Sequence, residues 1–300
     1  AATGISVVLV MARAFIQEKQ EGLGNFWQDF WRITIYLLLP VASILSILFI
    51  IQGVPQNWQK AIEIKQYANP QQHQLIPMGP VATHEAIKLL GTNGAGLTAA
   101  NSAHPFENPT PFTTFLQEIA VLIMPMMCCF LFAALLKNKR YAWAIWGMMF
   151  ILSSLMGWGA YFYQAKIPLG IETRIGLVDT VIFQVLNTAT ATGASMGILD
   201  WMSPLSNGFY LLLMNLGEIC FGGSGMGLVN MLVVLLLTAF ILNLLSGHSA
   251  SFLNKNIPLS VMKLSMFYII FAPCLILISL SLLMFSGQIE QQHPEVLSAW

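Results

Sequence analysis

The chain has 300 residues, of which 56% are hydrophobic and only 9% are charged, and its mean hydropathy is +0.70. An ordinary soluble domain carries roughly 25% charged residues, so the composition excludes a soluble globular protein. It predicts an all-α polytopic membrane protein whose partner is the lipid bilayer. Lys plus Arg and Asp plus Glu are equal at 13 each. No charge imbalance therefore points to a nucleic acid or to an acidic substrate.

The spacing of the cysteines excludes a further class of function. All of them lie in apolar runs, and none has the CxxC or Cys/His spacing of a zinc or redox site. We therefore expect them to be small buried hydrophobic residues. They are Cys128, Cys129, Cys220 and Cys274.

Membrane-spanning segments are the first elements to locate, and each needs about 20 largely apolar residues. The chain opens on Ala1 with no basic segment ahead of its first apolar run, which is not typical of a signal peptide. We expect it to be a piece of a longer polypeptide. Six segments approach the required length: 1–16, 31–52, 115–136, 141–162, 207–246 and 262–286.

The fifth segment, 207–246, is too long for one span. It is interrupted by FGGSGMG at 221–227. Glycine makes left-handed backbone available and provides no side chain to support a helix. The pattern predicts a helix that breaks inside the membrane and resumes at Leu228.

Two shorter apolar segments, 79–90 and 174–187, are each followed by a polar turn of small residues. The turns are TNGAG at 92–96 and TATATGAS at 188–195. Irregular backbone at membrane depth occurs only where it is buried in protein or lines a watery cavity. We therefore expect two re-entrant half-helices, each ending in a loop.

The basic residues indicate the orientation. If the six segments each cross once and the half-helices return, eight basic residues lie on one side and five on the other. The larger group is expected in the cytoplasm, so both polar turns open to the outside. The larger group is Arg13, Lys19, Arg32, Lys137, Lys139, Arg140, Lys255 and Lys263; the smaller is Lys60, Lys65, Lys88, Lys166 and Arg174.

The order of spanning segment, half-helix, polar turn and spanning segment occurs twice, at 31–136 and again at 141–246. Transporters are often built from such repeats, with the ion site at the repeat interface. The chain is therefore predicted to contain repeated helix, pore helix, filter loop and helix units.

The glycine-rich turn at 91–96 raises the question of a phosphate site. A Walker loop needs Lys and then Ser or Thr after its last glycine, and Leu97 follows Gly96 here. GAGLTA at 94–99 matches the loose dinucleotide pattern GxGxxA. That pattern carries meaning only after a strand, whereas a half-helix is expected before it.

A cation filter fits the two turns better. A dehydrated alkali cation needs several converging oxygens, which backbone carbonyls of a small-residue loop supply. The half-helix would also direct its partially negative C-terminal end at the ion. The alternative, a loop that only lets helices pack closely, has the same composition.

Several polar residues stand apart in the apolar background. Glu218 precedes the predicted break, and an ionisable residue at such depth is usually functional or paired. Glu85 and Lys88 are three apart on the first half-helix, which predicts an ordinary side-chain pair. His104 and Glu107 lie among prolines and are expected to turn the chain into the next helix.

Longer motifs carry a resemblance that covers essentially the whole chain. They are IPMGPVATHEAIKLLGTNGAG at 76–96, ANSAHPFENPTPFTTFL at 100–116, ETRIG at 172–176, LLLMNLGEICFGGSGMG at 211–227 and the region around FLNKN at 252–256. Together they resemble the KdpA family, the A subunits of Kdp potassium-transporting ATPases, within a superfamily of potassium transporters.

The resemblance implies four pseudo-repeats around one potassium pathway in the bacterial inner membrane. It also implies that a separate P-type ATPase subunit hydrolyses ATP and that small accessory subunits complete the complex. The resemblance implies that the chain binds K⁺. Because the chain contains no DKTG or Walker motif, we expect it to bind no nucleotide and not to be catalytic by itself.

The resemblance also assigns roles to particular residues. The filter is carried over onto Thr92, Asn93, Gly94, Ala95 and Gly96 in one turn and onto Thr188, Thr190, Thr192, Gly193 and Ala194 in the other. A gating loop is carried over onto Glu218, Gly222, Gly223, Gly225 and Gly227.

The chain departs from the family pattern at several positions. Ala95 replaces a filter glycine, and a left-handed backbone there would cost roughly 1–2 kcal/mol. Leu97 and Thr98 stand where aromatic residues are usual, and ILDW at 198–201 replaces MHDS. Residues 1–16 correspond to the last helix of a first repeat and 262–300 to the start of a fourth, so two of four filter loops are expected here.

The sequence therefore predicts the potassium-binding and translocating subunit of an ATP-driven uptake complex. The altered filter leaves a less selective cation channel or symporter subunit as an alternative. The two filter loops that fall outside these residues leave a non-conducting membrane scaffold fragment as another.

Overall fold

The structure is a computed structural model that describes residues 1–16, 22–65, 73–98, 100–217, 219–247, 251–252 and 255–285. The chain divides into two compact units, Ala1–Met231 and Leu232–Trp300. The first unit contains both polar turns and the interruption between the two parts of the fifth segment. Each unit is described by itself.

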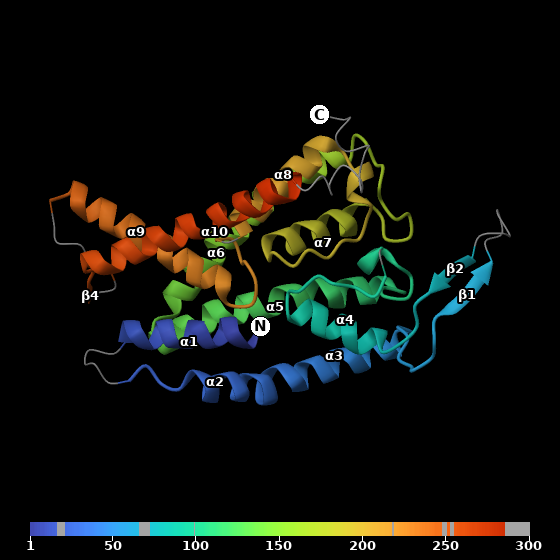
Figure 1. The fold of residues 1–300 in the computed structure, drawn as a ribbon, viewed down its shortest axis with the longest axis horizontal. Helices are drawn as coiled ribbons and strands as arrows, with labels where there is room; N and C mark the ends of the chain where they lie inside the picture. Colours follow the sequence, from blue (N-terminus) through green and yellow to red (C-terminus); the bar gives the residue numbers. More distant parts are fainter. Residues whose placement is uncertain are drawn as a thin grey trace. The chain divides into compact units, whose positions relative to one another are not determined.

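Helices make up most of the first unit (Figure 1), and one antiparallel hairpin, β1 with β2, adjoins them. The unit contains α1 (Ala2–Ile16), α2 (Phe26–Ile33), the π-helical turn η1 (Thr34–Leu38), α3 (Leu39–Ile51), β1 (Ile62–Lys65), β2 (His73–Ile76), α4 (Val81–Leu90), η2 (Asn101–Ala103), α5 (Pro111–Leu135), α6 (Lys139–Gln164), α7 (Leu177–Ala189), η3 (Leu199–Trp201) and α8 (Pro204–Gly217). The hairpin was not predicted, although IEIK in β1 alternates apolar and charged residues as a strand does.

The second unit continues from the helix α9 (Met226–Leu245), which begins in the first. It contains the short strand pair β3 (Ser251–Phe252) and β4 (Lys255–Asn256) and the long helix α10 (Leu259–Phe285). Cys274 on α10 is exposed, whereas the other three cysteines are buried as predicted. The expectation for Cys274 was wrong, because most side chains of α10 are exposed in the part of the chain that the structure describes.

Five helical segments are long and apolar enough to cross a membrane: Phe26–Ile51, Pro111–Leu135, Lys139–Gln164, Met226–Leu245 and Leu259–Phe285. The all-α membrane fold is therefore confirmed, and the chain is a multi-pass membrane protein. The sequence predicted six segments. The first of them is the shorter helix α1, and the fifth is divided between α8 and α9.

Among the described residues, the interruption between α8 and α9 covers 219–225 rather than 221–227. Three residues explain it, because Phe221, Gly223 and Gly225 have φ of +57°, +35° and +97° and cannot continue a right-handed helix. Gly227 lies in the first turn of α9, not in the interruption. Glu218 lies outside the described residues.

Local sequence determines where α5 begins after the NSAHPFENP segment. Thr110 caps the helix, since its side chain accepts a hydrogen bond from the Thr113 backbone N–H at 3.2 Å. The Thr113 hydroxyl accepts one from the Thr110 N–H at 2.8 Å, which completes a reciprocal capping box. Pro111 occupies the first turn, where a missing N–H costs nothing.

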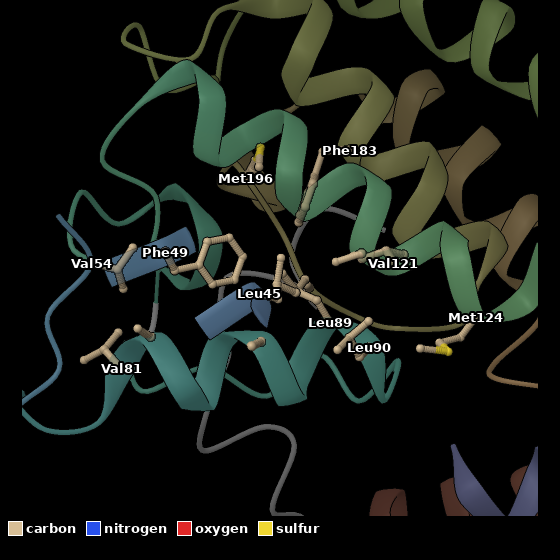
Figure 2. Packing of buried hydrophobic residues seen from close by; sticks show 14 residues of the cluster. Leu45, Phe49, Val54, Val81, Leu89, Leu90, Val121, Met124, Phe183 and Met196 are labelled. Atoms are coloured by element: carbon tan, nitrogen blue, oxygen red, sulfur yellow. The ribbon is translucent and has the colours of Figure 1, made fainter. Parts of the chain in front are cut away.

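A continuous apolar core lies around α4 (Figure 2). It joins side chains of α3, α4, α5 and α7, among them Phe49, Leu89, Val121 and Phe183. Met196, from the turn that follows α7, belongs to the same core and is fully buried. The turn after the second half-helix is therefore anchored in the packing of the first repeat unit.

We expect Phe49→Ala to destabilise the protein by about 3–5 kcal/mol, because it leaves a cavity in this core. The measurement is the midpoint of thermal unfolding in detergent. Phe115→Ala is the matched control, because that side chain is 54% exposed. Equal shifts for the two variants would contradict the assigned core.

Candidate ion filter and its supporting network

The two polar turns have the same backbone conformation. We call residues 91–98 loop A and residues 190–197 loop B. Loop A follows α4, and Thr92 and Gly94 have φ of +52° and +77°. Loop B follows α7, and Ala191 and Gly193 have φ of +50° and +79° at the corresponding positions. A shift of 99 residues superposes one pattern on the other.

The hydrogen bonds at the helix ends match as well. The Asn93 N–H donates to the Lys88 carbonyl at 3.0 Å, and the Thr192 N–H donates to the Asn187 carbonyl at 2.8 Å. Each bond spans five residues around a left-handed residue, which is the Schellman ending of a helix. The two half-helices therefore end in the same way and release their loops in the same direction relative to the helix.

Loop A and loop B touch each other backbone to backbone. A methyl group built on Gly94 would lie 1.8 Å from the Thr192 carbonyl oxygen and 2.9 Å from the Ala194 nitrogen. With its positive φ as well, this position accepts only glycine. A methyl group on Gly193 would meet nothing within 4 Å. The structure thus brings the predicted filter residues of both repeats together.

Ala95 does not have the strain that a glycine replacement would produce in a left-handed position. Its φ is not positive. Ala194 occupies the corresponding place in loop B and is fully buried. The cost considered for a left-handed alanine therefore does not arise.

The threonines of loop B direct their hydroxyl groups into the protein. Thr188 belongs to the last turn of α7, and its hydroxyl donates to the Gln184 carbonyl at 2.8 Å. The Thr190 hydroxyl lies 2.8 Å from the Leu186 carbonyl and 2.6 Å from the Thr192 hydroxyl. The hydrogens of these hydroxyl groups are already donated within the protein. An ion could therefore be coordinated by the lone pairs of the hydroxyl oxygens or by backbone carbonyl oxygens.

Residues 219–225, which we call the break loop, lie against the ends of both half-helices. The Gly222 N–H donates to the Ala189 carbonyl at 3.0 Å, and the Gly223 N–H donates to the Thr190 carbonyl at 2.7 Å. On the other side, the Ser224 hydroxyl donates to the Leu90 carbonyl at 3.1 Å. The break loop therefore pairs carbonyls that the helix ends would otherwise leave unsatisfied.

Two further contacts hold the break loop in place. The Ser224 N–H donates to the Thr92 hydroxyl oxygen at 3.2 Å. Gly225 packs against Gly4 of α1 so closely that a methyl group on it would lie 2.6 Å from the Gly4 carbonyl oxygen. Of the predicted gating glycines, Gly222 reaches the last residue of α7 and Gly223 reaches loop B, whereas Gly225 faces α1.

A buried ion-pair network lies behind loop A. Lys88 on α4 is 2% exposed, and its ammonium group donates to Asn101 Oδ1 at 2.6 Å, Ser102 Oγ at 3.1 Å and Glu107 Oε2 at 3.2 Å. These bonds use all three hydrogens of the group. Glu85 Oε2 lies 2.6 Å from the same nitrogen, and Ser102 donates to Glu85 Oε1 at 3.1 Å.

The network reaches loop A through two side chains. Asn101 Nδ2 donates to the Gly94 carbonyl at 2.7 Å. Glu107 Oε1 accepts from the Thr98 N–H at 2.9 Å and from the Thr98 hydroxyl at 2.7 Å. Gly96 lies over the same carboxylate, where a methyl group would be 3.0 Å from Oε2.

The sequence profile of the KdpA family, described as potassium-transporting ATPase A subunit, matches residues 1–298. The chain belongs to the KdpA family. It is 40% identical over 301 residues to the potassium-transporting ATPase potassium-binding subunit of Klebsiella pneumoniae subsp. pneumoniae, covering 95% of this chain and 53% of that protein. Its identity to the subunits of the same name from Yersinia pestis strain Pestoides F and Yersinia pseudotuberculosis serotype O:1b is 40% over 296 residues, covering 94% of this chain and 52% of theirs.

The chain spans about half the length of the curated relatives it matches. The network behind loop A was not predicted from the sequence. Glu85 and Lys88 were expected to pair, and they do. Glu107 was assigned to a turn, although its carboxylate completes the buried ion pair with Lys88. The signal was the group of polar residues in NSAHPFEN, which is unusual in so apolar a chain.

The two carboxyl groups of this network differ because one ammonium cannot neutralise both. Burial raises the pKa of Glu85 to about 7, and Lys88 only partly offsets this. Burial also opposes ionisation of Glu107, but Lys88 and the two bonds from Thr98 outweigh it and hold the pKa of that carboxyl below its ordinary value. Glu107 is therefore the partner that stays charged.

The raised pKa of Glu85 predicts a stability that depends on pH. Between the ordinary carboxyl value of 4.5 and about 7, the folded protein keeps a proton that the unfolded chain has lost. Stability should therefore fall as the pH rises through this window and change little above it. We expect Glu85→Gln to flatten the profile, measured as the thermal midpoint in detergent from pH 5 to pH 8.

Asp29→Asn is the control for this measurement. Asp29, in the first turn of α2, pairs with Arg13 and does not belong to the network around Lys88. If Glu85→Gln leaves the slope between pH 5 and pH 7 unchanged, the proton is not held at this position.

Proposed function

We propose that this chain forms the potassium-binding and translocating part of an ATP-driven potassium uptake complex. In this proposal a separate P-type ATPase subunit hydrolyses ATP, and small accessory membrane subunits complete the assembly. The relatives are named potassium-binding subunits of a potassium-transporting ATPase. That name motivates the choice of ion and of partner.

The observation that carries the proposal is the direct contact of loop A with loop B. Two loops of equal conformation, each at the end of a half-helix, meet where Gly94 faces the Thr192 carbonyl. A cation without its hydration shell needs oxygens from several sides, and converging backbones are the economical source. The half-helices also end here, so their partially negative ends face the same region.

The ion would pass loops A and B and then meet the break loop. The break loop bonds to the ends of both half-helices through Gly222, Gly223 and Ser224. This arrangement suits a gate, because the left-handed residues Phe221 and Gly225 let the backbone change direction without a helix on either side unwinding.

The proposed setting is the inner membrane of a bacterium, with the filter loops open to the outside. The distribution of basic residues supports this orientation. Lys88 is neutralised inside the protein, so it leaves the outer group, and five less one gives four against eight. The difference that favours the cytoplasmic side becomes larger.

The test is ATP hydrolysis by the complex that co-purifies with the complete reading frame of this chain. We expect potassium to stimulate hydrolysis saturably at concentrations where sodium and ammonium have little effect. Equal stimulation by the three cations would favour a less selective cation channel or symporter subunit. No cation-dependent hydrolysis and no co-purifying ATPase would contradict the proposal and favour a scaffold.

Gly94→Ala should weaken the apparent affinity for potassium by about tenfold or more, because a methyl group there would lie 1.8 Å from the Thr192 carbonyl oxygen and would force loop A away from loop B. The measurement is the potassium concentration for half-maximal ATPase stimulation. Gly147→Ala on α6 is the control, since a methyl group there meets nothing within 4 Å. Unchanged affinity in Gly94→Ala would remove loop A from the filter.

Ser224→Ala removes the hydroxyl that bonds the break loop to Leu90. We expect a faster leak of rubidium from proteoliposomes without ATP, because the closed position of the break loop loses one of its hydrogen bonds. Ser43→Ala is the control, since that hydroxyl bonds only within α3. A leak no faster than in the parent complex would contradict a gating role for this contact.

A further inference from the structure

We propose that Asn101 is a positioning residue for ion selection, and that Lys88 and Glu107 hold it in place. In this inference, which rests on the proposed function, the buried network fixes the direction of the Gly94 carbonyl in loop A. The inference concerns residues outside the TNGAG turn. None of the three is a filter residue in the assignment above.

Asn101 connects the network to the filter by both ends of its amide. Oδ1 accepts from the Lys88 ammonium at 2.6 Å, and Nδ2 donates to the Gly94 carbonyl at 2.7 Å. An ammonium group can only donate and a carbonyl can only accept. The amide therefore has one permitted orientation, and rotating it by 180° would set donor against donor and acceptor against acceptor.

The bond from Asn101 fixes a whole peptide plane. The Gly94 carbonyl and the N–H of Ala95 belong to the same planar unit, so neither can turn while Nδ2 holds the carbonyl. Because glycine has no side chain, its backbone has several accessible conformations. The bond from Asn101 helps to hold Gly94 in one of them, with a φ of +77°. A side-chain donor thus restricts the residue with the greatest backbone freedom.

Lys88 and Glu107 make this restraint stiff. Lys88 is fully enclosed, and its three hydrogens have fixed acceptors. Glu107 receives one of them and also binds the N–H and hydroxyl of Thr98 in the same loop. Loop A is therefore held at Gly94 and at Thr98 by one charged cluster.

Loop B has no corresponding ion pair among the described residues. The positions that match Glu85 and Lys88 are Gln184 and Asn187, which are neutral. Their side-chain oxygens are buried and have no hydrogen-bond partner within the described part of the chain. A methyl group on Gly193 would meet nothing within 4 Å. Of the two loops, loop A is therefore the one restrained by a charged network. We expect the Gly94 carbonyl in loop A to adjust its position to the size of an ion less than the carbonyls of loop B do.

The deciding variant is Asn101→Asp in the complete complex. Aspartate keeps an acceptor for Lys88 but replaces the donor to Gly94 with a second acceptor. We expect the ratio of apparent affinities for potassium and sodium to fall by about tenfold, the equivalent of one lost hydrogen bond. We expect the maximal ATPase rate at saturating potassium to change by less than about twofold.

Asn108→Asp is the matched control. Asn108 is a buried asparagine in the same segment, and its Nδ2 donates to the Thr114 hydroxyl at 2.9 Å and to the Met196 sulfur at 4.0 Å, and not to the Gly94 carbonyl. The same chemical change there should leave the ratio of affinities unaltered. If Asn101 serves folding alone, Asn101→Asp and Asn108→Asp should both lower the amount of complex and the maximal ATPase rate. The ratio of apparent affinities for potassium and sodium would then stay unchanged in both.

A second variant tests the same role in case the Asn101→Asp complex assembles poorly. Glu85→Gln, Lys88→Asn and Glu107→Gln together give the network the neutral character of Gln184 and Asn187, and no unpaired charge is left buried. We expect this variant to assemble and to show a similar loss of potassium preference.

The outcomes separate the two proposals. If the parent complex shows no potassium-dependent hydrolysis, the proposed function fails and this inference fails with it. If the parent responds to potassium but the variants keep its affinity ratio, only the positioning role is overturned. Failure of both variants to assemble, with Asn108→Asp assembling normally, would also count against it, because the network would then serve folding alone.

Discussion

The backbone contact between loop A and loop B is the constraint on which the rest of the structure depends. Gly94 can approach the Thr192 carbonyl only because it has no side chain. That approach requires the half-helices to end at matching depths, which the paired Schellman endings provide. It also requires loop B to be anchored in the core that α4 shares, which the burial of Met196 there achieves. The small residue Gly94 permits the contact between the loops, and the large buried side chain of Met196 holds loop B in the position that the contact needs.

A charged network is an expensive way to support a loop in an apolar protein, so its position is informative. Burying Lys88 is tolerable because Glu107 is ionised beside it and every hydrogen of the ammonium has an acceptor. Such a network has few alternative arrangements, since donors and acceptors must match at every bond. An apolar cluster of the same volume would give loop A more freedom. The charged side chains Lys88 and Glu107 thus restrict the backbone of loop A.

Much of the architecture could be predicted because it depends on local composition. The interruption near FGGSGMG and the half-helices before TNGAG and TATATGAS follow from glycine placement and segment length, and the boundaries moved by only a few residues. The role of Glu107 could not be predicted in this way. Its partner Lys88 is nineteen positions away, and no periodicity of a helix or strand relates the two. The fit of Ala95 likewise depends on a backbone angle that composition does not encode.

The break loop and the ends of both half-helices form one hydrogen-bonded unit. The carbonyls of Ala189 and Thr190 accept from Gly222 and Gly223, and the Leu90 carbonyl accepts from Ser224. Any displacement of the break loop must therefore leave helix-end carbonyls of both repeats without these donors. At such depth an unpaired carbonyl is costly unless water or a cation takes the place of the N–H. If loops A and B filter cations as proposed, a cation would stabilise the displaced arrangement that exposes those oxygens to it, and the position of the break loop would be thermodynamically linked to the occupancy of the pathway below the filter.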